Sequence, residues 1–445
     1  MTELPRPYQS YVYGYPHKTA YRPLADPRSL RTVWADEPVD ALSLYAHIPF
    51  CEFRCGFCNL FTRIGAPDDL TGRYLDALER QAIAVRNALG DRPVRFAAAA
   101  FGGGTPTYLT AAELERLCDI AEKRMGADLR AVPLSVETSP GTATADRLGV
   151  LAERGATRIS IGVQSFVESE ARAAVRPQRR GEVEAALGRI RAAGVPILNI
   201  DLIYGIDGQT ERSWRASLDA ALAWRPEELY LYPLYVRPLT GLAGAADSAD
   251  AEWDAQRLRL YAAGRDHLRA NGYEQVSMRM FRSGGARHDV PGSEFADYAC
   301  QTDGMVGLGC GARSYTAGLH YSFDYAVGVR EVRSIIDTYT RTRDFGHPQV
   351  GYPIDVDEAR RRHLLQSLLQ AEGMDIGAYR RRFGAEPAAH FRTELDEFER
   401  RGWLDPGAGP DRLRLSPDGL AYSDAVGPRL FSPAVRAAMA AYEPR

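Results

Sequence analysis

The sequence lacks long apolar runs and carries little excess charge of either sign. No stretch approaches the roughly 18 consecutive apolar residues that a membrane span requires. The start of the chain, Met1-Thr2-Glu3-Leu4-Pro5, has neither the basic residues nor the apolar stretch of a secretory signal. The formal net charge is only −3 over 445 residues, which argues against nucleic-acid binding through a general basic field. We therefore expect a cytoplasmic protein that has neither a membrane nor a nucleic acid as its partner.

Cysteine is scarce as well, and its placement is uneven. The chain has six cysteines, and three of them fall within the eight residues Cys51–Cys58. With 45% apolar and 25% charged residues, a chain of this length can bury a large core without disulfides. The clustered cysteines therefore favour metal binding in a reducing compartment. We expect the other three, Cys118, Cys300 and Cys310, to be thiols of the core.

From residue 42 onward, short apolar runs alternate with longer amphipathic stretches. The expected strands are Leu42–His47, Ala97–Phe101, Leu134–Glu137, Arg158–Val163, Ile197–Leu202 and Glu228–Leu234. The expected helices between them are Leu70–Leu89, Ala111–Arg124, Ala143–Arg154, Arg180–Ala193 and Glu211–Ala223. Strands that alternate with helices indicate parallel βα units with right-handed crossovers. Six such units predict an α/β fold with a full or partial (β/α) barrel, although a flat doubly wound sheet also fits the pattern.

Composition and periodicity divide the rest of the first 350 residues. Residues 1–40 are rich in Pro, Tyr and Arg and are expected to lie on the core as an N-terminal extension, either a packed arm or a substrate lid. Residues 41–245 hold the barrel units. Residues 246–350 are less regular and are expected to complete the barrel, with a helix near Glu252–Ala270 and a glycine-rich, strand-like region at Met305–Tyr315.

Residues 351–445 have a different character. Helices are expected at Asp355–Gln370, Ile376–Phe383 and Ala388–Arg401, followed by a small hairpin that includes Arg412–Leu415. This order is typical of a winged-helix-like module. Because no stripe of Lys and Arg marks a helix that would read DNA, we expect this module to pack on the barrel or to cover it.

The clustered cysteines follow the first expected strand, where a barrel places its catalytic loops. Thiolates are the ligands of iron–sulfur clusters, and Cys51-x3-Cys55-x2-Cys58 can wrap one [4Fe–4S] cube from a single loop. Three cysteines leave one iron open, which suits chelation by the amino and carboxylate groups of S-adenosylmethionine (SAM). The alternatives are a zinc site without its fourth ligand and three unrelated thiols. His47 lies near the loop, but its position on the strand makes it a poor fourth zinc ligand.

The run Tyr45–Cys58 resembles the cluster loop of the radical SAM superfamily, specifically of its HemN/HemW branch. That branch contains oxygen-independent coproporphyrinogen III oxidases, haem chaperones and a set of radical methyltransferases and cyclopropanases. Four further runs resemble motifs of the branch in order and spacing: Gly102–Leu109, Ser135–Pro140, Ile159–Phe166 and Asn199–Gly205. The resemblance covers residues 42–320 and, more loosely, the C-terminal module. It implies a partial (β/α)6 TIM-type barrel followed by a smaller C-terminal domain.

The resemblance also implies the cofactors and the residues that bind them. The metal ligands would be Cys51, Cys55 and Cys58, which hold a [4Fe–4S] cluster. SAM would be bound by residues of the motifs: Tyr45, Phe57, Gly103, Gly104, Thr105, Glu137, Gln164 and Arg176. A second SAM would lie near Asp201, Tyr235 and Arg313. A simple tight turn is the alternative for Gly102–Gly104, and a surface position is the alternative for Arg176.

The chemistry that the resemblance implies begins with one electron passed from the cluster to the sulfonium of SAM. This gives methionine and a 5′-deoxyadenosyl radical, which abstracts a hydrogen atom from a small-molecule substrate or from a second SAM. We expect an electron donor such as flavodoxin or ferredoxin, and a monomeric protein. The protein would position the cofactors and exclude water and oxygen.

Two departures from the relatives bear on the substrate. Coproporphyrinogen III oxidases carry another cysteine two residues after the third, where this chain has Leu60. Haem chaperones carry a His-Asn-x-x-Tyr-Trp motif, which is missing from the equivalent stretch Phe295–Asp303. We therefore expect a HemN-like enzyme with another substrate, a methyltransferase or cyclopropanase that uses both SAM molecules. Coproporphyrinogen III oxidase itself, and a haem-trafficking protein that binds haem through His288 or His320, are the alternatives.

Overall fold

The computed structural model describes residues 6–9, 11–12, 14–26, 28–243, 250–284 and 300–445, except for the side chain of residue 302. His288 and most of the stretch that was compared with the haem-chaperone motif lie outside these residues. Among the described helices, none is both long and apolar enough to cross a membrane.

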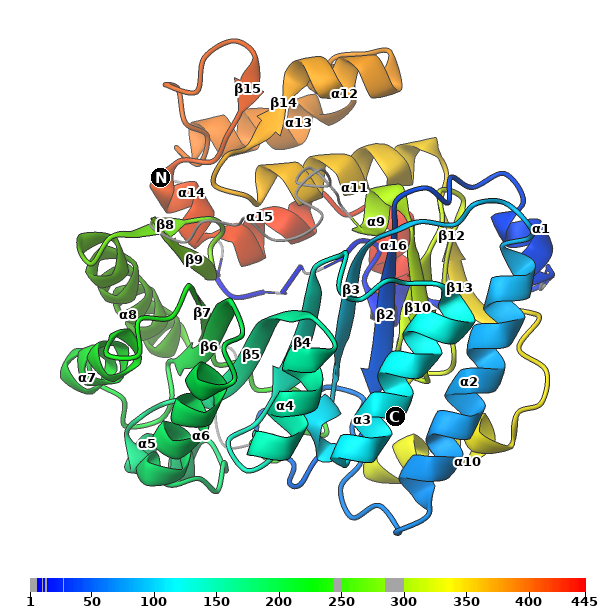
Figure 1. Cartoon of the computed structure of the whole chain (residues 1–445). Helices are drawn as coiled ribbons and strands as arrows, with labels where there is room; N and C mark the ends of the chain where they lie inside the picture. The colour runs from blue at the N-terminus through cyan, green and yellow to red at the C-terminus, as the bar shows by residue number, and fades with distance from the viewer. Residues whose placement is uncertain (1–5, 10, 13, 27, 244–249, 285–299) are drawn as a thin grey trace.

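One mixed sheet of 13 strands runs through the molecule (Figure 1). Its parallel centre consists, in spatial order, of β10 (Met305–Leu308), β2 (Leu42–Ile48), β3 (Phe96–Gly103), β4 (Leu134–Thr138), β5 (Ala156–Gln164), β6 (Ile197–Tyr204) and β7 (Glu228–Pro233). Antiparallel strands extend one edge with β9 (Met280–Ser283) and β8 (Tyr273–Gln275). The other edge continues with β11 (Arg313–Tyr315), β12 (Leu319–Ser322), β13 (Val350–Pro353) and β1 (Arg22–Pro23). Among the described residues the two edges do not pair, so the barrel is open.

The order of the parallel strands distinguishes a barrel from a flat sheet. From β2 to β7 the spatial order follows the chain order, whereas a doubly wound sheet reverses direction part-way. Right-handed crossovers that always step the same way place every helix on the same side of the sheet. The helices concerned are α2 (Leu70–Ala88), α3 (Ala111–Asp119), α4 (Ala145–Glu153), α5 (Glu168–Ala173), α6 (Arg180–Ala192) and α7 (Glu211–Leu222). The expected partial barrel is confirmed and the doubly wound alternative is wrong.

Local sequence signals place the ends of these helices. The Thr110 side chain accepts a hydrogen bond from the Glu113 N–H, and the Glu113 carboxylate accepts one from the Thr110 N–H, so that α3 begins with a capping box. The expected helix to Arg124 changes after Asp119 into a π-helical segment, Ile120–Met125, that ends at Gly126 with φ +80°.

The glycine-rich region Met305–Tyr315 is two strands rather than one. Gly309 and Gly311 have φ values of +96° and +97°, and the chain turns there so that β11 pairs back on β10. β10 in turn pairs in parallel with β2, with Met305 opposite Ser43. The glycine loop Gly309–Ala312 therefore lies beside the end of β2, from which the cysteine loop departs.

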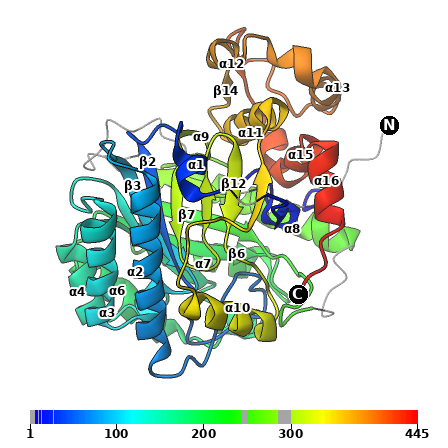
Figure 2. The same ribbon diagram turned by 90° about the vertical axis from the view of Figure 1, so that its right-hand side faces the viewer.

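The C-terminal module follows the expected winged-helix order. It contains α11 (Val356–Leu368), β14 (Met374–Asp375), α12 (Ile376–Phe383), α13 (Pro387–Arg400) and β15 (Arg412–Leu413), then α14 (Pro417–Ala421), α15 (Ser423–Arg429) and α16 (Pro433–Ala440). β14 pairs with β15, and a bridge joins Leu404 to Leu415. Figure 2 shows α11, α12 and α13 on one side of the barrel. The module has its own apolar core, which also includes Tyr15 and Ala20 of the N-terminal segment.

The N-terminal segment is a packed arm in this structure. In Figure 1 it runs in dark blue from the side of α8 (Ala251–Ala270) toward β2. The Tyr8 ring contacts the ring of Tyr204 on β6, and the Tyr11 ring contacts that of Tyr232 on β7, with centroids 6.3 and 6.2 Å apart. The arm thus crosses the open side of the barrel before it enters the C-terminal core.

Candidate functional site

Backbone hydrogen bonds close the cysteine loop directly after β2. The Cys51 N–H donates to the Arg63 carbonyl at 3.0 Å, and the Arg63 N–H donates to the Pro49 carbonyl at 2.6 Å. Within the loop, the Cys58 N–H donates to the Cys55 carbonyl at 3.1 Å. All three thiols are free and partly exposed. The loop therefore presents them together at the C-terminal end of β2.

The three thiols also affect one another electrostatically. Burial raises the pKa of Cys51 to about 12, and Cys58 and Cys55 add to the rise because like charges disfavour the thiolate. Burial and Cys55 likewise raise the pKa of Cys58. Three partly buried, neighbouring thiolates are therefore stable only when a positively charged metal centre binds them.

The donor set fits an iron–sulfur cluster better than a single metal ion. Within the described part of the chain, no three His, Cys, Asp or Glu side chains are grouped closely enough to hold one ion. A [4Fe–4S] cube spreads its cysteine ligands over separate iron atoms, so it suits thiols that face each other without converging on a point. Of the remaining cysteines, Cys118 and Cys310 are buried as expected, whereas Cys300 is half-buried.

The His47 side chain links the cysteine loop to two glycine-rich segments. Its ring is enclosed by two glycines: a Cβ added to Gly103 would lie 2.5 Å from the ring, and one added to Gly311 would lie 2.7 Å from it. The His47 Nε2–H donates to the Phe61 carbonyl at 3.0 Å, so Nδ1 accepts from the Tyr45 hydroxyl at 3.3 Å. Burial lowers the pKa of His47 to about 4, and the ring is neutral. The sequence analysis missed this role; the glycines that enclose the ring lie about 56 and 264 positions away in a sequence where nothing links them.

The glycine motif continues β3 alongside the cysteine loop. The Gly104 N–H donates to the Ile48 carbonyl and the Thr105 N–H to the Phe50 carbonyl, both at 2.8 Å. The Gly103 N–H donates to the Glu137 carboxylate at 3.0 Å. These N–H groups are used within the protein, so a ligand at the motif would meet carbonyl oxygens and the Glu137 carboxylate, which suit an ammonium group.

Glu137 is the penultimate residue of β4 and points into the barrel. Protein surrounds it, yet its side chain is exposed, so it lines an interior that is not filled by side chains. Burial raises the pKa of Glu137 to about 7, partly offset by the Gly103 N–H, and Asp201 adds to the rise. Burial also raises the pKa of Asp201, although Arg158 opposes this. Two carboxyl groups with raised pKa values therefore lie in the interior of the barrel.

Asp201 is held in place by its neighbours on β5 and β6. The Asn199 amide donates to the Asp201 carboxylate at 2.8 Å and to the Ser160 hydroxyl at 2.7 Å, and the Ser160 hydroxyl donates to Asp201 at 3.4 Å. One layer below, Arg158 forms an ion pair with Glu228 at 2.7 Å. Polar neighbours thus hold the Asp201 carboxylate in one orientation.

Gln164 is the last residue of β5, and Arg176, which follows α5, reaches this strand end with its guanidinium. Gln164 has φ +68°, a strained value for a residue other than glycine, and the pairing of β5 with β6 shifts register between Gly162 and Gln164. Arg176 is buried, and its Nη1 donates to the Cys55 thiol at 3.0 Å while its Nη2 donates to the Gly162 carbonyl. Arg176 is therefore not a surface residue.

The other expected SAM contacts are placed at different parts of the site. Phe57 packs beside Ala174 and Ile203. Arg313 begins β11 and lies near enough to His47 to contribute to the lowering of its pKa. Tyr235 points elsewhere, since its hydroxyl donates to Asp424 of the C-terminal module.

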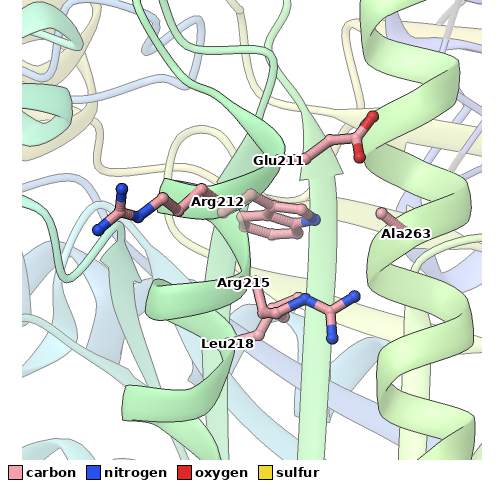
Figure 3. Close-up of a pocket in the computed structure, with 6 residues that line it drawn as sticks. Glu211, Arg212, Arg215, Leu218 and Ala263 are labelled. Carbon is pink, nitrogen blue, oxygen red and sulfur yellow. The ribbon is translucent and has the colours of Figure 1, made fainter.

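The structure thus brings most of the expected residues to one end of the barrel. A separate depression of about 260 Å³ lies between α7 and α8, lined by Glu211, Arg212, Trp214, Arg215, Leu218 and Ala263 (Figure 3). None of the expected cofactor residues contributes to it.

Comparison with known proteins agrees with this arrangement. Residues 45–221 match the Radical SAM superfamily. The chain contains a radical SAM domain. Within it, the chain is similar to the oxygen-independent coproporphyrinogen III oxidase of Escherichia coli (strain K12), with 28% identity over 404 residues that cover 87% of this chain and 86% of the relative. It is also similar to the heme chaperone HemW of Bacillus subtilis (strain 168), with 25% identity over 366 residues that cover 81% and 92%.

The fold agrees as well. The solved structure of coproporphyrinogen III oxidase (HemN) from Escherichia coli matches with a TM-score of 0.79 and 22% identity over 94% of this chain and 96% of that one. The expected resemblance to the HemN/HemW branch is therefore confirmed. As a radical SAM enzyme, the chain uses a [4Fe–4S] cluster and SAM as its cofactors.

Proposed function

We propose that this radical SAM enzyme removes a hydrogen atom from a small molecule held in the open barrel. The observation that carries the proposal is the placement of Cys51, Cys55 and Cys58 at the end of β2, beside the glycine motif and the Glu137 carboxyl of adjacent strands. The C-terminal ends of parallel strands are where barrel enzymes place their reactive groups.

Each group in this arrangement has a distinct task. When bound, the cluster would supply one electron that splits SAM into methionine and a 5′-deoxyadenosyl radical. The Glu137 carboxylate and the carbonyls of the glycine motif would bind the amino group of SAM. Asp201, fixed by Asn199 and Ser160, would bind hydroxyl or amino groups of a ligand deeper in the barrel. The N-terminal arm would exclude water from the open side, because its tyrosines contact β6 and β7.

The substrate we propose is not coproporphyrinogen III. Leu60 replaces the additional cysteine of those oxidases, and its side chain is 46% exposed beside the cluster loop. The similarity to coproporphyrinogen III oxidases supports the same oxidation as the second candidate. Methyl transfer or cyclopropanation with a second SAM, bound near Asp201 and Arg313, is the third.

A haem-chaperone role is the least supported of the alternatives. Its support is the similarity to HemW. His320, one of the two histidines considered for haem, is buried, and its Nε2 accepts a hydrogen bond from Arg362 at 2.8 Å, so it is not available to iron.

The test begins with anaerobic reconstitution and a reductant such as flavodoxin or dithionite. We expect about four iron atoms per chain and reductant-dependent formation of 5′-deoxyadenosine. Cys55→Ala should abolish this formation, whereas Cys300→Ala, which removes a half-buried thiol outside the loop, should retain it. Unchanged formation in Cys55→Ala would overturn the proposal.

A second experiment separates the candidate reactions. The reconstituted enzyme is incubated with coproporphyrinogen III, and separately with metabolite extract and SAM labelled in its methyl group. A divinyl product would select the coproporphyrinogen reaction, and label in a product would select methyl transfer. 5′-Deoxyadenosine without either outcome would support oxidation or rearrangement of another small molecule. Stoichiometric binding of added haem would instead support the chaperone role.

A further inference from the structure

Each of the three ligand sulfurs has a side-chain hydrogen-bonding partner, and the three partners come from different parts of the chain. The Thr105 hydroxyl lies 3.5 Å from the Cys51 sulfur, and the Thr62 hydroxyl lies 3.9 Å from the Cys58 sulfur. The Arg176 guanidinium donates to the Cys55 sulfur at 3.0 Å. Arg176 is the only one of these three partners that carries a charge, and it makes the shortest contact.

Arg176 is fixed by the bulge at the end of β5. Its Nη2 donates to the Gly162 carbonyl, and its Nε donates to the Gln178 side-chain oxygen at 2.7 Å. The Gln178 amide in turn donates to the Val163 carbonyl at 2.6 Å. The strained backbone at Gln164 thus turns carbonyl groups of β5 toward this pair of side chains. Arg176 is only 6% exposed, so its charge is poorly screened by solvent.

We infer that Arg176 is a positioning residue that raises the reduction potential of the cluster through its hydrogen bond to the Cys55 sulfur. Hydrogen bonds to the sulfurs and nearby charge are among the factors that set the potential of an iron–sulfur cluster. Reduction adds a negative charge to the cluster, and a buried guanidinium on a ligand sulfur stabilises that charge. The inference rests on the [4Fe–4S] assignment and goes beyond it, because it concerns how readily the cluster accepts its electron.

The test is a redox titration of the reconstituted full chain, monitored by the electron paramagnetic resonance signal of the reduced cluster. At the wild-type midpoint potential, the ratio of reduced to oxidised cluster should fall about tenfold in Arg176→Gln, a shift of about 59 mV to lower potential for one electron. Arg176→Lys keeps the charge but loses the planar fork, so it should shift the potential less and in the same direction.

Arg54 offers a matched control. It belongs to the cysteine loop, but its guanidinium donates to the carbonyls of Cys58, Leu239 and Val327 rather than to a sulfur. Arg54→Gln therefore removes a nearby charge without removing a hydrogen bond to a ligand sulfur. We expect a much smaller shift than in Arg176→Gln. An equal shift in both variants would overturn the inference, because the effect would then be a general field rather than the contact to Cys55.

Iron and sulfide analysis of each protein shows whether it holds a full cluster, and so separates failed assembly from a changed potential. Failure of the wild type to assemble a cluster would contradict the cofactor assignment itself. If only Arg176→Gln fails to assemble one, Gln178→Leu replaces it as the test, since that change frees Arg176 Nε without removing the charge. A smaller shift to lower potential in Gln178→Leu supports the inference. A wild-type potential in every variant that holds a full cluster would overturn it.

Discussion

His47 shows how a single residue can shape the site without touching a reactant. The sequence analysis considered it only as an unsuitable zinc ligand. In the structure it is a neutral ring between Gly103 and Gly311, with both nitrogens engaged by Phe61 and Tyr45. Two glycines are needed because a Cβ at either position would overlap the ring. The ring therefore joins the glycine motif, the glycine loop and the cysteine loop.

Substitution of Gly103 tests this contact. Gly103 has φ +110°, and an added Cβ would lie 2.5 Å from the buried His47 ring, so Gly103→Ala should destabilise the fold by about 3 kcal/mol or more. Gly126→Ala is the control, because Gly126 also has a positive φ, +80°, but no atom within 4 Å of its Cβ position. It should cost only about 1–2 kcal/mol. Equal losses in urea unfolding would contradict a role for the ring.

Glu137 gives a prediction about pH. Its pKa of about 7 means that the carboxyl is ionised at pH 8 and mostly protonated at pH 6. Only the ionised form attracts an ammonium group, so the dissociation constant for SAM should rise about tenfold from pH 8 to pH 6. In Glu137→Gln binding should be weak at both values and should lack this step. Isothermal titration calorimetry with the reconstituted protein measures both, and parallel pH profiles would argue against an ammonium contact.

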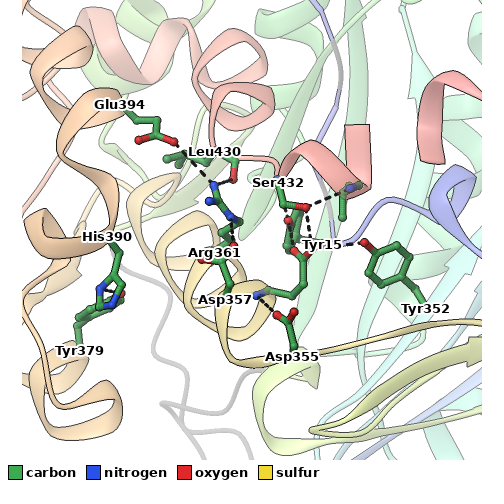
Figure 4. A network of polar contacts seen from close by, with 12 residues as sticks. Tyr15, Tyr352, Asp355, Asp357, Arg361, Tyr379, His390, Glu394, Leu430 and Ser432 are labelled. Carbon is green, nitrogen blue, oxygen red and sulfur yellow. Dashed lines mark hydrogen bonds and ion pairs between the residues drawn. The ribbon is translucent and has the colours of Figure 1, made fainter. Parts of the chain in front are cut away.

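At the scale of elements, the N-terminal arm connects the barrel to the C-terminal module. The sequence analysis left open whether residues 1–40 form a packed arm or a lid. The arm is held at Tyr15, whose hydroxyl donates to the buried Glu358 carboxylate and accepts from the Ser432 N–H at 3.1 Å (Figure 4). Ser432 and Tyr352 also donate to Glu358, at 2.7 and 3.3 Å. The arm, strand β13 and the C-terminal module thus meet at one carboxylate.

Removal of the Tyr15 hydroxyl should loosen the arm. Tyr15→Phe leaves the buried Ser432 N–H without its acceptor and takes one donor from Glu358, so the free energy of unfolding should fall by about 2–3 kcal/mol. Tyr352→Phe removes a longer bond to the same carboxylate and should cost about 1 kcal/mol or less. Urea unfolding gives these values, and limited proteolysis should cut the arm faster only in Tyr15→Phe. Equal proteolysis of the two variants would contradict the role of Tyr15.

The elements that the sequence predicted best are those with a local signal. β2 to β7 alternate with amphipathic helices, and each expected strand overlaps an observed one. β10 was expected only as part of a strand-like region, and its pairing with β2 was not foreseen. That pairing joins residues more than 250 positions apart, and a four-residue strand carries too little pattern to specify its neighbour.

At the scale of the whole molecule, four histidines with lowered pKa values contribute to the loss of stability in acid. Burial lowers the pKa of His17 to about 3 and of His47 and His363 to about 4, and it lowers that of His320 well below its usual value. An unfolded histidine binds a proton near pH 6.5, whereas these folded histidines do not. Their contribution to the free energy of unfolding is therefore fully present above pH 6.5 and is lost as the pH falls toward 4. The raised pKa values of Glu137 and Asp201 act in the opposite direction and offset part of this loss.

His320 provides the test. Protonation would place an imidazolium beside the Arg362 guanidinium, with 2.8 Å between the two nitrogens. The free energy of unfolding of the wild type, measured in urea, should be lower at pH 5 than at pH 7. In His320→Gln the slope with pH should be shallower by up to about 1.4 kcal/mol per pH unit. Identical slopes in the wild type and in His320→Gln would contradict the assignment.

The sequence by itself determined the proposed cluster ligands, the βα alternation and the family resemblance, because each depends on residues that are close together along the chain. Cys51, Cys55 and Cys58 share one loop, and thiolate chemistry needs no further context to suggest iron and sulfur. Only the tertiary structure decided what surrounds those ligands. The His47 ring between distant glycines, the Arg176 contact to Cys55, the arm across the barrel and the pairing of Tyr235 with Asp424 all depend on which strand ends meet. Such contacts follow from packing between remote segments, for which one sequence contains no local signal.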